Sequence, residues 1–436
     1  MVNIAKVFST LGNPNSLVPL AVKDISATAG MTTASFATGK EEGLDRFIDE
    51  IGTEVIWLGG IPAFKWLFDK TVFKSLGLDA KFDARNLTNK NVLEKIQQFA
   101  PNDEIKENIA KILKKESLFK NAVSAKFVVS TTMAIASYVG LTHFKQKYTD
   151  NKIREGLIAE YEAKQNKQAN EQTGLKGSKN PSFKGLSSVV QDFAFDPVKN
   201  MWILDGAITA ERLKDSRSPQ EFMGYGIKEA STLLFMYYFG DKIQGYLEKR
   251  AAEKGKSISL DARVLEGGDL KKTFDDGSIT KSLEQFKSAC STPEATYDFL
   301  HKNPDNMIVK VAKESDVISM YKESQGLFKK AKVTDKIDTR RFIDLEKINV
   351  IKNNIEELYS NYQKALSNGE TSEAFFEGVK KLKRKSIITN IGTCILALGV
   401  VTPVIMLAKR LMGKDDSEFQ TKKEIREQLI KEGRIA

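Results

Sequence analysis

An uncharged apolar stretch near the C-terminus constrains this chain more than any other feature. Residues 387–408 read IITNIGTCILALGVVTPVIMLA, and 11 of these 22 residues are Ile, Leu or Val. As a helix, the stretch would measure about 33 Å at about 1.5 Å per residue, which is enough to cross a hydrocarbon layer of about 30 Å. The aliphatic side chains outweigh Asn390 and Pro403 on a membrane-insertion scale. The sequence therefore predicts a membrane span at 387–408.

Composition predicts the fold class. The chain has 436 residues, of which 41% are hydrophobic, so it can form two or three compact units. Only 10 residues are proline, and Lys, Glu, Leu, Ile and Ala, which favour long helices, are abundant. We expect an all-α, membrane-associated protein with at least one transmembrane helix, two or more being favoured, and a soluble helical region.

A second apolar segment, 127–144, has no charged residue over 18 positions but contains five Ser or Thr residues and His143. It is a weaker candidate span than 387–408, and a buried core helix is the alternative. Thr132, Ala136 and Gly140 lie four residues apart, on one face of such a helix. Small residues at this spacing let helices approach closely in lipid, so we expect these three residues to form a helix-packing face.

Shorter apolar segments occur near residue 55 and at 201–210 and 230–240. Segments of about ten residues are more typical of core or interfacial helices than of spans. If 222–240 does cross a membrane, Lys228 and Glu229 would mark a functional site inside the bilayer, because charges are costly there.

The chain divides into six predicted segments along its length. They are an N-terminal loop-rich part with an interfacial or re-entrant apolar segment (1–86), amphipathic helices with the candidate span 127–144 (87–150), a polar linker (151–185), aromatic-rich interfacial or membrane helices (186–250), a soluble helical region (251–378), and the span 387–408 with basic flanks and a charged tail (379–436). In the soluble region, apolar residues recur at threes and fours over 338–367, which predicts a long helix there.

Basic residues are concentrated on both sides of the C-terminal span, in a chain whose net charge is +10. Cations beside a span contribute about 1 kcal/mol each against anionic lipid. The candidate lipid contacts are Lys380, Lys381, Lys383, Arg384, Lys385, Lys409 and Arg410. The alternative is that they only end the apolar segment and stay solvated. The two flanks are equally basic, so they predict no orientation. Nucleic-acid binding is not expected, because exposed aromatics do not alternate with these lysines.

Nothing in the sequence matches a catalytic or cofactor motif. The only histidines are His143 and His301, and the only cysteines, Cys290 and Cys394, lie far apart, so a zinc site or a disulfide framework has too few ligands. GxSxG, HExxH, CxxC and GxGxxG motifs do not occur. We therefore expect a protein that is not an enzyme, with no catalytic residue, no cofactor and no metal.

Three hypotheses about function follow. The first is a membrane-anchored helical scaffold whose 251–378 region binds a protein partner. The second is a polytopic transport or channel-like component in which the shorter apolar segments also lie in the bilayer. The third is a soluble helical protein that buries its apolar helices. The first two place the chain in a membrane as an integral helical protein, without predicting which membrane.

Overall fold

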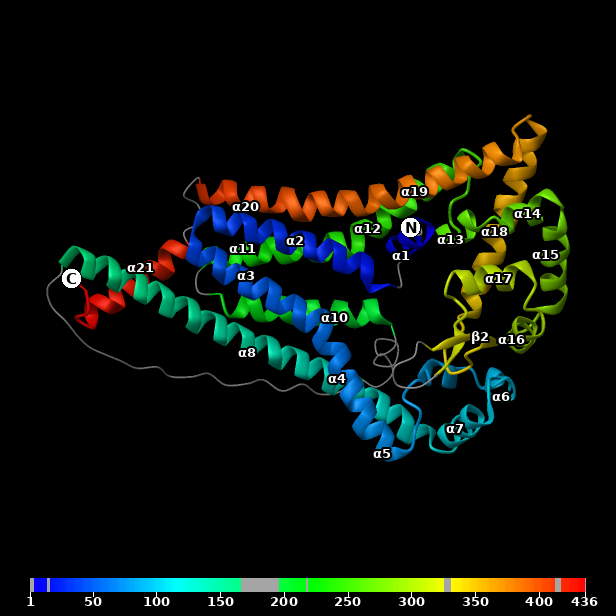
Figure 1. Cartoon of the computed structure of the whole chain (residues 1–436), viewed down its shortest axis with the longest axis horizontal. Coiled ribbons are helices and arrows are strands. Elements are labelled where there is room, and N and C mark those ends of the chain that lie inside the picture. Colours follow the sequence, from blue (N-terminus) through cyan, green and yellow to red (C-terminus); the bar gives the residue numbers. More distant parts are fainter. Residues whose placement is uncertain are drawn as a thin grey trace.

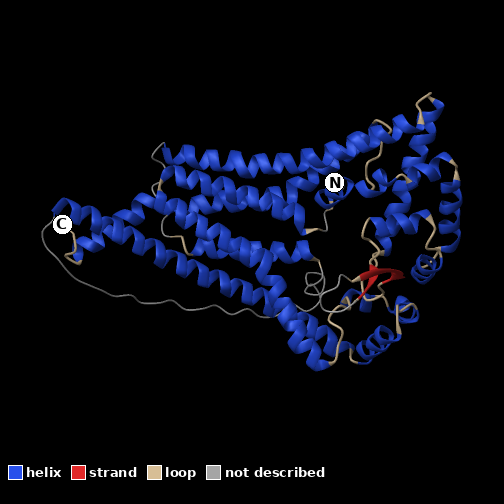
Figure 2. Cartoon of the chain, in the orientation of Figure 1, coloured by secondary structure: helices blue, strands red, loops and turns tan. Residues whose placement is uncertain are grey.

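The computed structural model describes residues 4–13, 16–165, 196–216, 219–324, 331–411 and 417–435. Helices account for nearly all regular structure in these ranges (Figure 2). Within them, the only strands are β1 (Met320–Glu323) and β2 (Lys332–Ile337), which pair as an antiparallel hairpin. The predicted all-α class is confirmed.

Long helices form a bundle at one end of the molecule (Figure 1). These helices, called the bundle below, are α2 (Leu17–Thr38), α3 (Lys40–Val55), α4 (Ile61–Phe68), α8 (Glu116–Gln165), α10 (Pro197–Lys214), α11 (Pro219–Leu233), α12 (Gly240–Glu253), α19 (Ser372–Leu396) and α20 (Thr402–Leu411). Short π-helical turns continue several of them, namely η1 (Ile56–Gly60), η2 (Asp69–Phe73), η4 (Leu234–Phe239) and η5 (Ala397–Val401). Short helices pack at the other end.

Residues 73–123 and 251–379 form one globular domain around a shared apolar core. Its elements are α5 (Lys74–Leu76), η3 (Ala84–Thr88), α6 (Lys90–Gln98), α7 (Asp103–Lys114), the start of α8, α13 (Ala262–Gly267), α14 (Asp269–Asp275), α15 (Ser278–Ala289), α16 (Pro293–Lys302), α17 (Met307–Glu314), the hairpin, α18 (Leu345–Ser367) and the start of α19. The backbone N–H of Asp83 donates to Arg340 O at 2.8 Å, which ties the two stretches together. The prediction that 87–150 and 251–378 are separate units is therefore wrong for residues 87–123.

Side-chain caps set where the helices of this domain begin. Asn102 accepts a hydrogen bond from the N–H of Ile105 at 2.9 Å and starts α7 just after Pro101. Asp344 accepts from the N–H groups of Glu346 and Lys347 at 3.1 Å each and starts α18. The predicted helix over 338–367 therefore begins at Leu345, because residues 338–341 form a turn.

Two helices of the described chain are long and apolar enough to cross a membrane, Glu116–Glu162 and Ser372–Ala408. They contain the predicted spans 127–144 and 387–408. In their most apolar windows only 39% and 33% of the residues are buried, so most of these residues are at least partly exposed. Pro403 does not break the second helix, since the wider turn of η5 precedes it and Thr402 Oγ1 donates to Ala397 O at 3.0 Å.

The N-terminal and linker predictions need correction. Residues 1–86 are not loop-rich, because α1 (Ile4–Gly12), α2 and α3 occupy most of the described part. Residues 151–165 are not a linker but continue α8, whose Ile153 and Leu157 pack against Ile425 and Leu429 of α21 (Ser417–Lys431). The rest of the predicted linker, 166–185, lies outside the described residues.

Large apolar side chains cover the outside of the bundle. They include Val18 and Ile25 on α2, Phe47 and Ile51 on α3, Trp66 on α4, Val128, Val129 and Met133 on α8, Trp202 on α10, Tyr238 and Phe239 on η4, and Leu396, Val400 and Val404 on the last helices. In the globular domain, the exposed large apolar residues of the described chain are Leu118, Val333, Val350 and Leu366. The apolar surface therefore belongs mainly to the bundle.

Candidate functional site: a buried ionic network in the bundle

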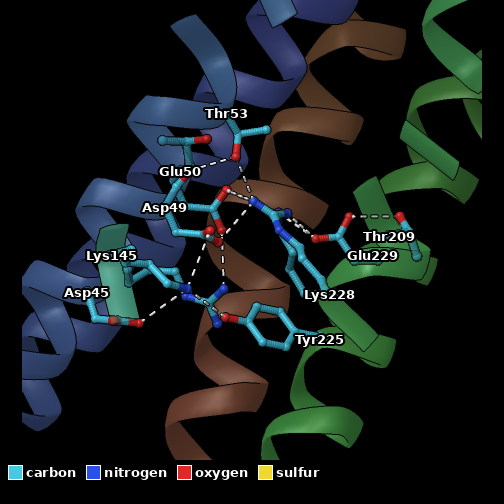
Figure 3. A network of polar contacts seen from close by, with 12 residues as sticks. Asp45, Asp49, Glu50, Thr53, Lys145, Thr209, Tyr225, Lys228 and Glu229 are labelled. Atoms are coloured by element: carbon cyan, nitrogen blue, oxygen red, sulfur yellow. Dashed lines mark hydrogen bonds and ion pairs between the residues drawn. The ribbon is translucent and has the colours of Figure 1, made fainter. Parts of the chain in front are cut away.

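Charged side chains from four helices meet inside the bundle (Figure 3). We call this cluster the ionic network. Every member is buried, with at most 8% of its surface exposed. The members are Asp45, Arg46, Asp49 and Glu50 of α3, Tyr138 and Lys145 of α8, Arg212 of α10, and Tyr225, Lys228 and Glu229 of α11.

Helical spacing explains how α3 contributes to the network. Asp45 and Asp49 lie one turn apart, as do Arg46 and Glu50, so all four fall on one side of the helix. Phe47 and Ile51 lie on the opposite side and are 45% and 42% exposed. The polar face of α3 thus points into the molecule and its apolar face points out, the reverse of a helix on a water-soluble protein.

Arg212 lies at the centre of the ionic network. Its guanidinium forms ion pairs with Asp49 at 3.0 Å and with Glu229. It also donates from Nε to the Tyr138 hydroxyl at 2.9 Å and from Nη2 to Thr53 Oγ1 at 3.1 Å. A single planar cation therefore links α10 to three other helices, which suits the several donors of arginine.

Lys228 and Glu229, flagged from the sequence, both lie in the network. Lys228 Nζ is 3.1 Å from Glu50 Oε2 and 2.9 Å from Glu229 Oε1. Glu229 Oε2 also accepts from Thr209 Oγ1 at 3.3 Å. The two residues join α11 to α3 and α10.

A second cation, Lys145, connects α8 to the same network. Its Nζ is 3.5 Å from carboxylate oxygens of both Asp45 and Asp49 and donates to the Tyr225 hydroxyl at 3.4 Å. The Tyr225 ring lies against the guanidinium of Arg46, 5.0 Å from the ring centre. Arg46 in turn pairs with Glu50 at 3.3 Å.

The network is balanced in charge. Its four bases, Arg46, Lys145, Arg212 and Lys228, face four acids, Asp45, Asp49, Glu50 and Glu229. Removing one partner of a buried pair leaves an uncompensated charge and costs about 3–5 kcal/mol. Well-packed apolar residues of the same volume are often as stable as a buried ion pair or more stable, so the network is weak evidence for stability.

The predicted lipid-contacting lysines differ in what they contact. Lys383 is buried and donates to Ile258 O at 2.8 Å, so the prediction of a lipid contact is wrong for this residue. Lys380 pairs with Glu377 at 2.9 Å, and Arg384 donates twice to Glu266 at 2.6 Å.

Two of the predicted lysines remain exposed. Lys381 and Lys385 line a shallow hollow on α19, together with Arg384 and Ile388. Lys409 and Arg410 belong to α20, but their side chains lie outside the described part of the structure.

The predicted packing face of α8 is not covered by the part of the chain that the structure describes. Thr132, Ala136 and Gly140 are exposed, and a methyl group added at Gly140 would meet no described atom within 4 Å. Their role as a helix-packing face in lipid stays a prediction. The face that packs carries Ala134 and Tyr138, because Tyr138 reaches Arg212 and Asp49.

Most of the ionic network was missed by reasoning from the sequence. Asp49 and Arg212 are 163 positions apart by their numbering, and no local pattern links them. One sequence signal could have identified the contribution of α3. Its charged residues recur at i, i+4 spacing on one face, and the apolar Phe47 and Ile51 lie on the other. Histidines and cysteines do not contribute, and the described residues contain no group of three or more His, Cys, Asp or Glu that could hold a metal ion.

No protein-family model matches the chain, and no curated protein or solved structure is significantly similar to it. The functional argument therefore depends on the chemistry of the residues themselves.

Proposed function

We propose that the chain is a polytopic helical membrane protein, with the bundle in the bilayer and the globular domain at one membrane face. We further propose that it acts as a transport-type component whose functional centre is the ionic network. The observation that carries this proposal is the polarity of the bundle, which buries the ionic network beside a small apolar cluster and exposes many large apolar residues on its outside.

This polarity is what a bilayer favours. A lipid-facing helix gains by exposing residues such as Val128 and Leu396, whereas the same residues in water favour association with another surface. Ionisable residues at membrane depth face the bundle interior and pair with one another, as Arg212, Asp49 and Glu229 do. The 22 residues of α2 measure about 33 Å, close to the thickness of the hydrocarbon layer.

This reading favours the transport hypothesis over the scaffold hypothesis. A scaffold needs one anchor only, and α19 to α20 would supply it. It does not explain why α2, α3, α10 and η4 also expose large apolar residues. A protein partner of 251–378 stays a prediction, since the exposed apolar residues of that region are scattered singly.

The hollow on α19 supports a membrane boundary close to the globular domain. Lys381, Arg384 and Lys385 line it one to two turns before Ile388, which is 58% exposed. Cations directly before an exposed apolar surface match the headgroup level of an anionic leaflet. We therefore place the edge of the hydrocarbon layer near residue 387.

Cysteine labelling at matched positions tests the proposal. Trp202 on α10, Tyr238 on η4 and Val350 on α18 are each 53% exposed. Each is replaced by cysteine in a chain carrying Cys290→Ser and Cys394→Ala, and opened native membranes are treated with a membrane-impermeant maleimide. Because the three positions are equally exposed, differences in labelling should depend mainly on whether water or lipid surrounds each cysteine.

We expect Val350→Cys to be labelled, and Trp202→Cys and Tyr238→Cys to be labelled only after the membrane is dissolved in denaturing detergent. Labelling of all three at similar rates in intact membranes would exclude the polytopic arrangement and favour a single-anchor scaffold.

A further inference from the structure

Three more carboxyl groups lie beside the ionic network and line a small internal cavity. They are Asp24 of α2, Glu54 of α3 and Asp205 of α10. The cavity measures about 20 Å³, so it has room for about one water molecule. We call it the acidic cavity.

Two polar atoms of the acidic cavity have no hydrogen-bond partner among the described residues. Glu54 is 8% exposed, and its Oε1 accepts from Thr28 Oγ1 at 3.2 Å, but its Oε2 is unpartnered. Thr232 Oγ1, from α11, is also buried and unpartnered. Buried polar atoms without a partner are rare and indicate a bound proton, water or ion.

The charges around the cavity do not balance. Its two cations, Lys228 and Arg212, are already paired with Glu50, Asp49 and Glu229. Among the described residues, no lysine or arginine lies within ion-pair distance of Asp24, Glu54 or Asp205. Three unpaired carboxylates in an apolar bundle would be very costly, and a carboxyl group in that position takes up a proton instead.

A contact leads out of the acidic cavity toward the globular domain. The Tyr237 hydroxyl donates to Asp205 Oδ2. Tyr237 also lines a second cavity of about 70 Å³ near α1, whose polar walls include Lys23, Asp241 and Asn390. The Tyr237 and Asp205 pair therefore separates two polar spaces within the bundle.

We propose that the acidic cavity is a proton-binding site centred on Glu54, which exchanges protons with the second cavity through Asp205 and Tyr237. A metal cation fits less well, because the described carboxylates include no group arranged to hold one. The inference deepens the proposed function, because a proton site beside a buried ionic network is what proton-coupled transport requires.

Groups from four helices face Glu54 and set its environment. These are Asp24 and Thr28 of α2, Glu50 and Thr53 of α3, Asp205 and Arg212 of α10, and Lys228, Glu229 and Thr232 of α11.

Infrared spectroscopy of the full chain in liposomes tests the proton-binding site. We expect the carbonyl stretch of a protonated carboxylic acid near pH 7, where solvated carboxyls are ionised. Glu54→Gln should remove part of that band and Asp205→Asn a further part. Glu211→Gln, on the same helix as Asp205 but paired with Lys214, should leave it unchanged.

Absence of the band near pH 7, or equal spectra for Glu54→Gln and Glu211→Gln, would overturn the proposal. A second variant tests the exchange route, because Tyr237→Phe should keep the band but slow its shift after transfer to deuterated buffer several-fold. An unchanged exchange rate would exclude the Tyr237 route.

The infrared test of the proton site and the labelling test of membrane embedding can fail independently. If the maleimide labels Trp202→Cys and Tyr238→Cys while the Glu54 band persists, the chain holds a buried proton site but is not embedded as proposed. If the labelling pattern is the expected one and the band is absent, the chain is embedded and the proton site is wrong.

Discussion

The bundle buries a network of charged side chains, whereas the largest buried cluster of the globular domain is apolar. At the centre of the globular domain, Phe274, Tyr362 and Phe376 pack ring against ring, with centroids 5.5 to 5.9 Å apart. At the centre of the bundle, Arg212 and Asp49 form an ion pair at 3.0 Å. The bundle also buries a smaller apolar cluster that includes Trp57, Leu204 and Leu398, but many of its other large apolar residues lie on its surface.

Under the proposed function, the difference reflects two solvents for one chain. In the globular domain the apolar groups are buried away from the surface, as expected for a domain that folds in water. The proposal places the bundle in hydrocarbon, where an apolar exterior costs nothing and polar groups must be satisfied inside. The start of α19 belongs to the first region and its end to the second, so one continuous helix crosses the boundary.

The largest effect is expected from removing the central cation of the bundle. Arg212→Ala leaves Asp49 and Glu229 buried without their main partner, and should destabilise the bundle by about 3–5 kcal/mol. Lys152→Ala removes an exposed ion pair with Glu155 on α8 and should cost about 0–1 kcal/mol. Unfolding in lipid bicelles by added denaturing detergent measures both. Equal losses of stability in the two variants would mean that the ionic network contributes no more than an exposed ion pair.

An intermediate effect on stability is expected from placing a lysine on the surface of the bundle, compared with a lysine on the surface of the globular domain. Leu396 of α19 and Val333 of β2 are 56% and 57% exposed, so they differ mainly in surroundings. Lysine in place of Leu396, at the middle of 387–408, should cost about 2.5–3.5 kcal/mol in a bilayer. Lysine in place of Val333 should change the free energy of unfolding by no more than about 0.5 kcal/mol. The same bicelle measurement compares them, and similar small costs for both would contradict a lipid-facing Leu396.

The smallest effect concerns a surface acid of the globular domain. Burial would raise the pKa of Asp275, but hydrogen bonds from Ser372, Lys271 and Tyr362 outweigh it and lower the pKa to about 2. Because the folded pKa lies below the unfolded value of 3.8, this group contributes stability above pH 3.8 and the contribution is lost as the pH falls toward about 2.

The Asp275→Asn variant should therefore lose less stability than the wild type between about pH 4 and about pH 2. The thermal unfolding of the full chain in bicelles, followed at the two pH values, measures the difference. A steeper loss in the variant would show that other groups dominate the acid response of this domain.

Local signals in the sequence predicted the helices of the long apolar runs but missed those in 1–86 and 151–165. The uncharged run 387–408 and the weaker run 127–144 are helical as expected, since the apolar residues of these runs outweigh residues such as Pro403. The helix α17 begins at Met307 because Asn306 accepts from the N–H of Ile308 and caps it.

Long-range organisation could not be predicted in the same way. The globular core joins residues such as Phe119 and Ile355 from stretches far apart in the sequence, and the ionic network joins α3 to α10 and α11. Such contacts depend on how the helices pack, and one sequence carries no pairwise signal for packing. Lys228 and Glu229 were found because a charge beside an apolar segment is unusual. Arg212 was not, because it lies among the charged residues at the end of α10.

The most direct test of the two-solvent account compares spin labels at matched positions on the two regions. A nitroxide is attached to Leu396→Cys or Val333→Cys in the reconstituted full chain lacking Cys290 and Cys394. Collision rates are then measured with dissolved oxygen, which concentrates in hydrocarbon, and with a water-soluble nickel chelate. The account predicts that the label at 396 collides mainly with oxygen and the label at 333 mainly with the chelate. Equal access of the chelate to both labels would contradict it.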